Sequence, residues 1–314
     1  MKKVYDGIVG LAIGDAIGVP VEFINRQEIA ENPVVSMREF GTHHQPMGTW
    51  SDDTSLTLAL IDSMIETKSI DYADIMDRFS NWLMYSDYTA TGEVFDVGNS
   101  TSRAIMNYGR RVNPLECGGV SEYDNGNGSL MRILPIAYFL QKQFTSLMDY
   151  QMEIIHNISS LTHRHPVSLI GCGIYINIAI RLMQGERSLY ESVEEGIKNA
   201  FEYYKRNSWA DIRAYERLKE LSSFSKLSEI EIESSGYVVH TLEAALWCLL
   251  NTDSYAECVL KAVNLGDDTD TVGAVVGGLA GIYYGADKIP KEWMTVLARR
   301  QYIEELCEKF QRLE

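Results

Sequence analysis

Residues 266–285 read GDDTDTVGAVVGGLAGIYYG, in which crowded acids precede a glycine at every fourth position from Gly273 to Gly285. Near the N-terminus, glycines also recur at helical spacing from Gly7 to Gly18. A glycine costs about 1 kcal/mol relative to alanine inside a helix, so such helices need a compensating gain. Close approach of a neighbouring backbone supplies it, because a helix face of small residues leaves room for another helix. The pattern predicts two tightly packed, glycine-faced helices that both lie beside unusual acids.

Most of the remaining chain also shows helical periodicity. Within residues 189–204, apolar side chains fall on one face at spacings of 4, 4, 4 and 3. The chain has only 7 prolines, and strict period-two alternation is scarce, so helices joined by loops are predicted. The longest loops are expected at about residues 25–50, 87–99 and 113–129. The sequence therefore predicts a single all-α domain over residues 1–314, in which the more charged residues 186–235 could be a peripheral insertion.

Composition restricts the class of protein. The formal net charge of -16 disfavours binding to nucleic acid phosphates or to anionic lipid. The best apolar stretches, residues 169–183 and 272–286, look too short to span a bilayer and are expected to be buried helices. The N-terminus shows no signal-peptide pattern, and the 5 scattered cysteines without a CxxC pair indicate reduced thiols. A cytoplasmic protein that binds no membrane is predicted.

Two acidic clusters lead into helical segments. Residues 51–54 read SDDT, and residues 267–271 read DDTDT. One interpretation is helix capping, because Ser, Thr and Asp are favoured at helix N-termini. The other is metal binding, because crowded carboxylates repel one another unless a cation neutralises them. Ligands that are all oxygens select a hard cation such as Mg²⁺, Mn²⁺ or Ca²⁺ rather than zinc. The spacing leaves both interpretations open.

Six segments in order resemble one known family. They are GLAIGDAIGVPVEF (10–23), GTWSDDT (48–54), TGEVFDVGNS (91–100), NGNGSLMR (125–132), LTHRHP (161–166) and LGDDTDTV (265–272). Together they make the chain similar to the ADP-ribosylglycohydrolases over about residues 5–286. The resemblance implies an all-α fold with a two-metal site between helices, which usually holds two divalent cations, Mg²⁺ or Mn²⁺.

The resemblance also implies roles for individual residues. The implied metal ligands are Ser51, Asp52, Asp53, Asp268, Asp270 and Thr271. Ser51 replaces the family's usual threonine, which preserves the hydroxyl. Asp267 stands where many members have glycine and is expected to be a supporting or surface acid. The implied catalytic carboxylates are Glu22 and Asp96, and the match at Asp96 favours the bacterial branch that contains the dinitrogenase reductase-activating glycohydrolase.

The same resemblance places the substrate. The implied ADP-ribose contacts are Gly126, Asn127, Gly128, Ser129 and His163. Glycines in such a loop let backbone amides approach the phosphate oxygens. Outside the family context, the loop is only a turn signal and the histidine is a satisfied core or helix-end residue.

Other polar residues receive lesser assignments. Arg132 could meet phosphate, but in so acidic a chain an internal salt bridge is favoured. No role is assigned to His43 or His44, and His165 precedes a proline and marks a boundary.

The implied activity is metal-dependent hydrolysis that removes ADP-ribose from an ADP-ribosylated protein, with ADP-ribosyl-arginine as the first candidate linkage. Cleavage at C1″ of the ribose needs carboxylate assistance, which Glu22 or Asp96 would give as acid or base. Linkages to serine, nucleic acid or small molecules remain open. Two other classes are an ADP-ribose reader or crystallin-like member without activity, and a two-metal phosphoester hydrolase. The intact carboxylates disfavour the reader.

Overall fold

The helical periodicity of the sequence is realised along the chain. The computed structural model describes residues 4–141 and 149–313, and within these residues it contains α-helices and short 3-10 helices but no β-strand. The α-helices are α1 (Val4–Gly18), α2 (Arg26–Glu31), α3 (Asp52–Thr67), α4 (Tyr72–Tyr85), α5 (Asn99–Gly109), α6 (Pro135–Gln141), α7 (Asp149–Ser160), α8 (Pro166–Gln184), α9 (Leu189–Arg206), α10 (Leu221–Phe224), α11 (Val238–Leu250), α12 (Tyr255–Val263), α13 (Thr269–Tyr284), α14 (Lys291–Val296) and α15 (Arg300–Gln311). The 3-10 helices are η1 (Val19–Val21), η2 (Gly41–His43), η3 (Pro114–Glu116), η4 (Glu122–Asp124), η5 (Ala210–Lys219), η6 (Glu229–Glu231) and η7 (Ala286–Lys288). The all-α prediction is confirmed.

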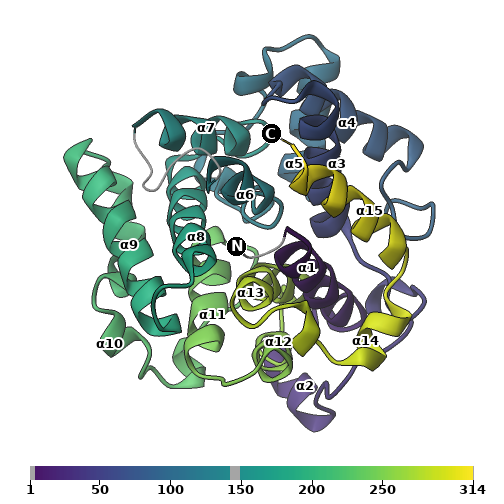
Figure 1. The fold of residues 1–314 in the computed structure, drawn as a ribbon, viewed down its shortest axis with the longest axis vertical. Helices are drawn as coiled ribbons and strands as arrows, with labels where there is room; N and C mark the ends of the chain where they lie inside the picture. Colours follow the sequence, from purple (N-terminus) through teal and green to yellow (C-terminus); the bar gives the residue numbers. More distant parts are fainter. Residues whose placement is uncertain (1–3, 142–148, 314) are drawn as a thin grey trace.

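The two glycine-faced helices, α1 and α13, pack against each other in the centre of the molecule (Figure 1). A Cβ atom built on Gly14 would lie 2.0 Å from the carbonyl oxygen of Gly273, and one on Gly10 would lie 2.4 Å from that of Gly277. Both distances are far below van der Waals contact, so only glycine fits at these positions. The predicted close approach of backbones is therefore confirmed, and each glycine-faced helix is the other's partner.

The last glycine of the series has a different role. Gly285 is not part of α13 but follows it with a φ of +93°. Its N–H donates to the carbonyl oxygen of Gly281 at 2.9 Å and closes the last turn. The sequence period extends one glycine too far, because a helix-ending glycine has the same spacing as a packing glycine.

The other helices cover this central pair. Helices α8, α11 and α12 lie against α13, whereas α3 and α15 lie against α1 (Figure 1). Tyr255 and Tyr175 are fully buried, and their hydroxyls donate to the carbonyl oxygens of Gly10 at 2.6 Å and Val275 at 3.0 Å. The buried side chains form a hydrophobic core that includes all five cysteines, each of them a free thiol.

The charged residues 186–235 form α9, η5, α10 and η6. In Figure 1, α9 and α10 lie at the edge of the molecule, on the outer side of α8. A Cβ atom on Gly196 of α9 would lie 2.6 Å from the Cα atom of Ile178 in α8, so the two helices are in close contact. This region is therefore packed onto the core.

Two helical segments have the length and hydropathy of a membrane span, Val4–Val21 and Pro166–Gln184. The expectation that no stretch reaches that length is wrong for these two. In the structure, however, 89% and 83% of the two segments are buried inside the protein. Packing in the core accounts for their apolar character.

The contact between α1 and α13 can be tested by substitution. We expect Gly14→Ala to lower the free energy of unfolding by about 3 kcal/mol or more, because the added methyl group meets backbone atoms that cannot rotate away. Urea unfolding followed by circular dichroism measures the change. Gly109→Ala is the matched control, since a Cβ atom there meets nothing within 4 Å; it should change the free energy by less than about 1 kcal/mol. Equal stability of both variants would contradict the packing described.

Candidate metal centre and catalytic site

Acids from three separate helices meet beside the central helix pair. Asp15 lies on α1, Asp53 in the first turn of α3, and Asp270 in the first turn of α13. One carboxylate oxygen from each lies within 4.8 Å of the other two, and all three residues are fully buried. The two acidic clusters of the sequence therefore converge in space.

Two further groups of side chains extend this cluster. Asp270 also forms a group with Glu22 and Asp268, and Glu22 forms another with His43 and Asp96, again within 4.8 Å. Glu22 is buried, whereas His43 and Asp96 are only partly buried. The result is a continuous chain of carboxylates from the protein interior to a more exposed rim.

Asp15 ties α1 to the N-terminus of α3. Its Oδ1 accepts from the N–H of Ser51 at 2.8 Å, and its Oδ2 accepts from the N–H and the hydroxyl of Thr54 at 3.1 and 2.6 Å. Ser51 is the N-cap of α3, and its side chain accepts from the N–H of Asp53 at 3.3 Å. Helix capping and convergence of acids thus both occur. Ser51 caps α3, so the carboxylates of Asp52 and Asp53 are not needed for capping and are available to bind a cation.

The acids before α13 are held by other contacts. Asp268 occupies the N-cap position without capping the helix, and its Oδ2 accepts from the side-chain amide of Asn127 at 2.8 Å. Asp270 accepts from the N–H of Thr271 at 2.8 Å, and the hydroxyl of Thr271 lies 3.4 Å from Oδ1 of Asp53. Asp267 is exposed, as expected for a surface acid.

Burial makes the charged form of these carboxyl groups unfavourable. It raises the pKa of Asp15 to about 7. Burial and the neighbouring Asp96 and Asp268 raise the pKa of Glu22 to about 10. The pKa values of Asp52, Asp53 and Asp270 are raised well above the usual range, first by burial and then by neighbouring acids. Carboxyl groups in such a cluster tend to be neutralised, either by binding protons or by binding a cation.

The donor set fits a hard divalent cation. Asp53 and Asp270 each have one buried carboxylate oxygen, Oδ2, that has no hydrogen-bond partner within the described part of the chain. Unpaired buried oxygens are costly, and a cation between them would satisfy both. The groups formed by Asp15, Asp53 and Asp270 and by Glu22, Asp268 and Asp270 offer only oxygens, the ligands that Mg²⁺ and Mn²⁺ prefer. These residues could therefore hold metal.

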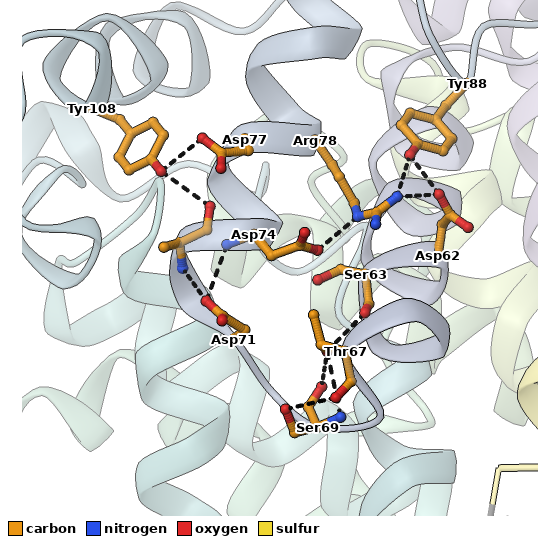
Figure 2. A network of polar contacts seen from close by, with 11 residues as sticks. Asp62, Ser63, Thr67, Ser69, Asp71, Asp74, Asp77, Arg78, Tyr88 and Tyr108 are labelled. Atoms are coloured by element: carbon orange, nitrogen blue, oxygen red, sulfur yellow. Dashed lines mark hydrogen bonds and ion pairs between the residues drawn. The ribbon is translucent and has the colours of Figure 1, made fainter.

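Asp96 lies on a loop that is anchored to α3 and α4. Figure 2 shows Arg78 of α4 in contact with Asp62 of α3 and bonded to Asp74 at 2.7 Å. The hydroxyl of Tyr88, at the start of the loop, donates to Asp62 at 2.7 Å and accepts from Arg78 at 2.9 Å. Asp96 itself has a φ of +48°. The network fixes the beginning of the loop, and the loop brings the carboxylate to the rim.

The glycine-rich loop at residues 126–129 lies next to the acids and to His163. Asn127 joins this loop to Asp268, as described above, and its N–H donates to the carbonyl oxygen of Gly236 at 3.1 Å. A Cβ atom on Gly128 would lie 2.7 Å from Cε1 of His163. Burial lowers the pKa of His163 to about 3, so this imidazole is neutral. Loop, histidine and acids are thus brought together.

Ser129 differs from its neighbours in the loop. It is fully buried, and its hydroxyl accepts from that of Ser159 at 2.8 Å and lies 3.5 Å from the thiol of Cys172. Its side chain therefore faces the core, and its backbone is the part that the loop can present.

The favoured salt bridge of Arg132 is absent from the part of the chain that the structure describes. The guanidinium is fully buried, and it donates to the hydroxyl of Thr162 at 2.7 Å and to the carbonyl oxygen of Ile158 at 3.3 Å. It also lies over the ring of Phe79, 4.7 Å from the centroid. Carbonyl, hydroxyl and π-electron partners replace the expected carboxylate.

Two members of the site received no role from the sequence, Asp15 and His43. Asp15 lies in the apolar, glycine-faced segment that ends at Gly18. An acid within such a segment could have been recognised from the sequence as a candidate site residue. His43 had none, because it lies in a polar loop 21 residues from its partner Glu22.

Known proteins resemble this chain over nearly its full length. The family described as ADP-ribosylglycohydrolase matches residues 1–314. An ADP-ribosylarginine hydrolase of Serratia proteamaculans is 32% identical over 98% of this chain and 79% of its own length. The ADP-ribosyl-dinitrogen reductase glycohydrolase of Rhodospirillum rubrum is 31% identical over 92% of this chain and 88% of its own length. A solved structure, described as an ADP-ribosylglycohydrolase-related protein complex, matches with a TM-score of 0.80 and 30% identity over 99% of this chain and 97% of that chain.

Because the acids are buried, we expect stabilisation of the fold by a bound cation to depend on pH. A carboxyl group whose pKa is raised in the folded state binds more protons there than in the unfolded state, so its contribution to stability is lost as pH rises through the folded-state pKa. For Asp15, this contribution to the free energy of unfolding is completely lost only above about pH 7. We therefore expect Mn²⁺ to raise the Tm of EDTA-treated protein more at about pH 8 than at about pH 5, because the cation binds the deprotonated form.

Variants of neighbouring acids control that experiment. Asp270→Asn should lose most of the Mn²⁺-dependent rise in Tm, since it removes a buried carboxylate shared by two of the acidic groups. Asp267→Asn changes an exposed acid whose φ of +61° asparagine tolerates, and it should keep the rise. Identical behaviour of the two variants would place the cation elsewhere.

Proposed function

The chain belongs to the ADP-ribosylglycohydrolase family, and from this premise we propose that it is a metal-dependent hydrolase that releases ADP-ribose from ADP-ribosyl-arginine in a protein. The observation that carries the proposal is the convergence of Asp15, Asp53 and Asp270 with Glu22 and Asp268 at the N-terminal ends of two helices. The arginine linkage is supported by the relative in Serratia proteamaculans, an ADP-ribosylarginine hydrolase that matches almost the whole chain.

The proposed cofactor is a pair of Mg²⁺ or Mn²⁺ ions. The proposed ligands are Ser51, Asp52, Asp53, Asp268, Asp270 and Thr271, with Asp15 holding the first three in place through its bonds to the start of α3. Bound divalent cations would supply clamping of sugar hydroxyls and a lowered pKa for a bound water. Two observations support ions that prefer oxygen ligands: two buried carboxylate oxygens have no hydrogen-bond partner within residues 4–141 and 149–313, and the two carboxylate groups around Asp270 contain no His or Cys.

The proposed catalytic pair is Glu22 and Asp96. Cleavage of a glycosidic bond needs a group that donates a proton to the leaving atom and a group that accepts one from water. Both carboxyl groups lie toward the rim of the cluster, and the raised pKa of each favours its protonated form. Two adjacent carboxyl groups with raised pKa values can divide the acid and base roles between them.

The proposed ADP-ribose contacts are the backbone of residues 126–129 and the neutral ring of His163. Gly126 and Gly128 have no side chain to keep the main chain from phosphate oxygens, and Asn127 links this loop to Asp268. Ser129 contributes only through its backbone, because its hydroxyl faces the core. This arrangement supports a substrate that extends from the loop to the carboxylates.

The proposed setting is the cytoplasm, with an ADP-ribosylated protein as partner. The net charge of -16 repels nucleic acid and anionic membranes, and five buried free thiols suit a reducing compartment.

The first test is the reaction itself. We expect the purified protein to release intact ADP-ribose from ADP-ribosyl-arginine with Mg²⁺ or Mn²⁺ and to release none with EDTA, as followed by chromatography. ADP-ribose binding without release would favour a different linkage first and a reader second. AMP or phosphate as product would favour the two-metal phosphoester hydrolase instead.

The role of Asp96 is tested separately. We expect Asp96→Ala to lower kcat roughly 100-fold or more, as loss of an acid or base does, while the Kd for ADP-ribose in calorimetry changes little. Glu93→Ala removes an exposed acid from the same loop and should keep wild-type kcat. If Asp96→Ala weakened binding as much as turnover, Asp96 would be a binding residue.

A further inference from the structure

His43 makes a contact that links it to both proposed catalytic acids. Its Nε2 forms a hydrogen bond with Oε2 of Glu22, and Asp96 belongs to the same group of three side chains. The imidazole is 13% exposed and the Glu22 carboxylate 3% exposed. The histidine therefore lies between solvent and the Glu22 carboxylate.

The loop around His43 is built onto the segment that carries Glu22. The hydroxyl of Thr42 donates to the backbone carbonyl oxygen of Glu22 at 2.7 Å. Gly41, at a φ of +52°, sits so close to the same segment that a Cβ atom would lie 1.9 Å from the carbonyl oxygen of Pro20. Glu22 is thus held twice by consecutive residues, at its backbone by Thr42 and at its carboxylate by His43.

The ring of His43 is also fixed by aromatic neighbours. Its centroid lies 6.0 Å from that of Phe23 and 5.2 Å from that of Phe95. These two residues directly follow Glu22 and directly precede Asp96. These ring contacts add to the hydrogen bond with Glu22 in setting the orientation of the imidazole.

We propose that His43 is a positioning residue for catalysis, which holds one oxygen of Glu22 and so directs the other oxygen toward the reacting bond. The proposal rests on the function proposed above. A carboxylate on a short loop can rotate about its last bond, and a fixed donor on one oxygen removes that freedom. Misplacing a catalytic group by about 1 Å can cost on the order of 100-fold in rate, so a residue that only orients Glu22 can still matter for turnover.

The test compares kcat and KM for ADP-ribosyl-arginine in three variants with bound Mn²⁺. His43→Ala should lower kcat roughly 10- to 100-fold with KM and the Kd for ADP-ribose nearly unchanged. His43→Gln keeps a side-chain N–H donor and should recover part of the loss. His44→Asn is the matched control, because His44 is exposed and has a φ of +55° that asparagine tolerates; it should behave like the wild type.

A double-mutant cycle separates positioning from a merely structural role. If His43 acts through Glu22, His43→Ala should lower kcat little further once Glu22→Gln is present. Equal losses of kcat in both backgrounds, or a change confined to KM, would overturn the proposal. An active wild type with an unaffected His43→Ala would do the same while leaving the proposed function intact.

A spectroscopic measurement tests the hydrogen bond between His43 and Glu22 independently of enzyme activity. In ¹⁵N-labelled protein, the ring signals of His43 should report a hydrogen bond at Nε2, and Glu22→Gln should shift them. Unchanged ring signals in that variant would overturn the proposal. If the wild type released no ADP-ribose, the proposed function would fail, and a positioning role for His43 in that reaction would fail with it, although the ring signals would still show whether His43 holds Glu22.

Discussion

The contact between α1 and α13 is the constraint on which the rest of the site depends. Gly10 and Gly14 lie against Gly273 and Gly277 with their backbones in direct contact, and α1 continues directly to Asp15. Any side chain at these positions would push the helices apart. Because the acids stand at the ends of the glycine-faced segments, the same separation would pull apart the carboxylates that share the cluster. Close packing therefore sets the geometry of the candidate metal centre.

The cluster gathers charge that the interior of a protein disfavours. Partial compensation comes from the backbone and side chains around it: Asp15 accepts three hydrogen bonds from the start of α3, and the N-terminal ends of α3 and α13 carry partial positive charge. The compensation is incomplete, since Asp53 and Asp270 each keep a buried oxygen that has no hydrogen-bond partner among the described residues. An arrangement that costs stability without a cation is typical of a functional site.

The interior and the rim of the site are built differently. The interior acids are on helices or their first turns, which hold them rigidly, whereas Glu22, His43 and Asp96 come from connecting segments. These segments are held by contacts with one another, such as Thr42 with Glu22, and with the helical scaffold, such as Tyr88 with Asp62 of α3. Loops on a rigid framework commonly carry specificity and chemistry. The ligand set is thus fixed by helix packing, and the orientation of the rim acids depends on loop contacts.

The sequence alone determined the all-α fold, the two glycine-faced helices and the family resemblance, because helical periodicity and contiguous motifs are local properties of the chain. It also supplied most candidate site residues, since these lie within the motifs. Only the tertiary structure decided that Asp15 and His43 join the site, that Ser129 faces the core and that Arg132 has no carboxylate partner among the described residues. Those outcomes depend on contacts between segments far apart in sequence, such as Thr271 with Asp53. Such contacts follow from how the helices pack, and packing is a property of the whole fold.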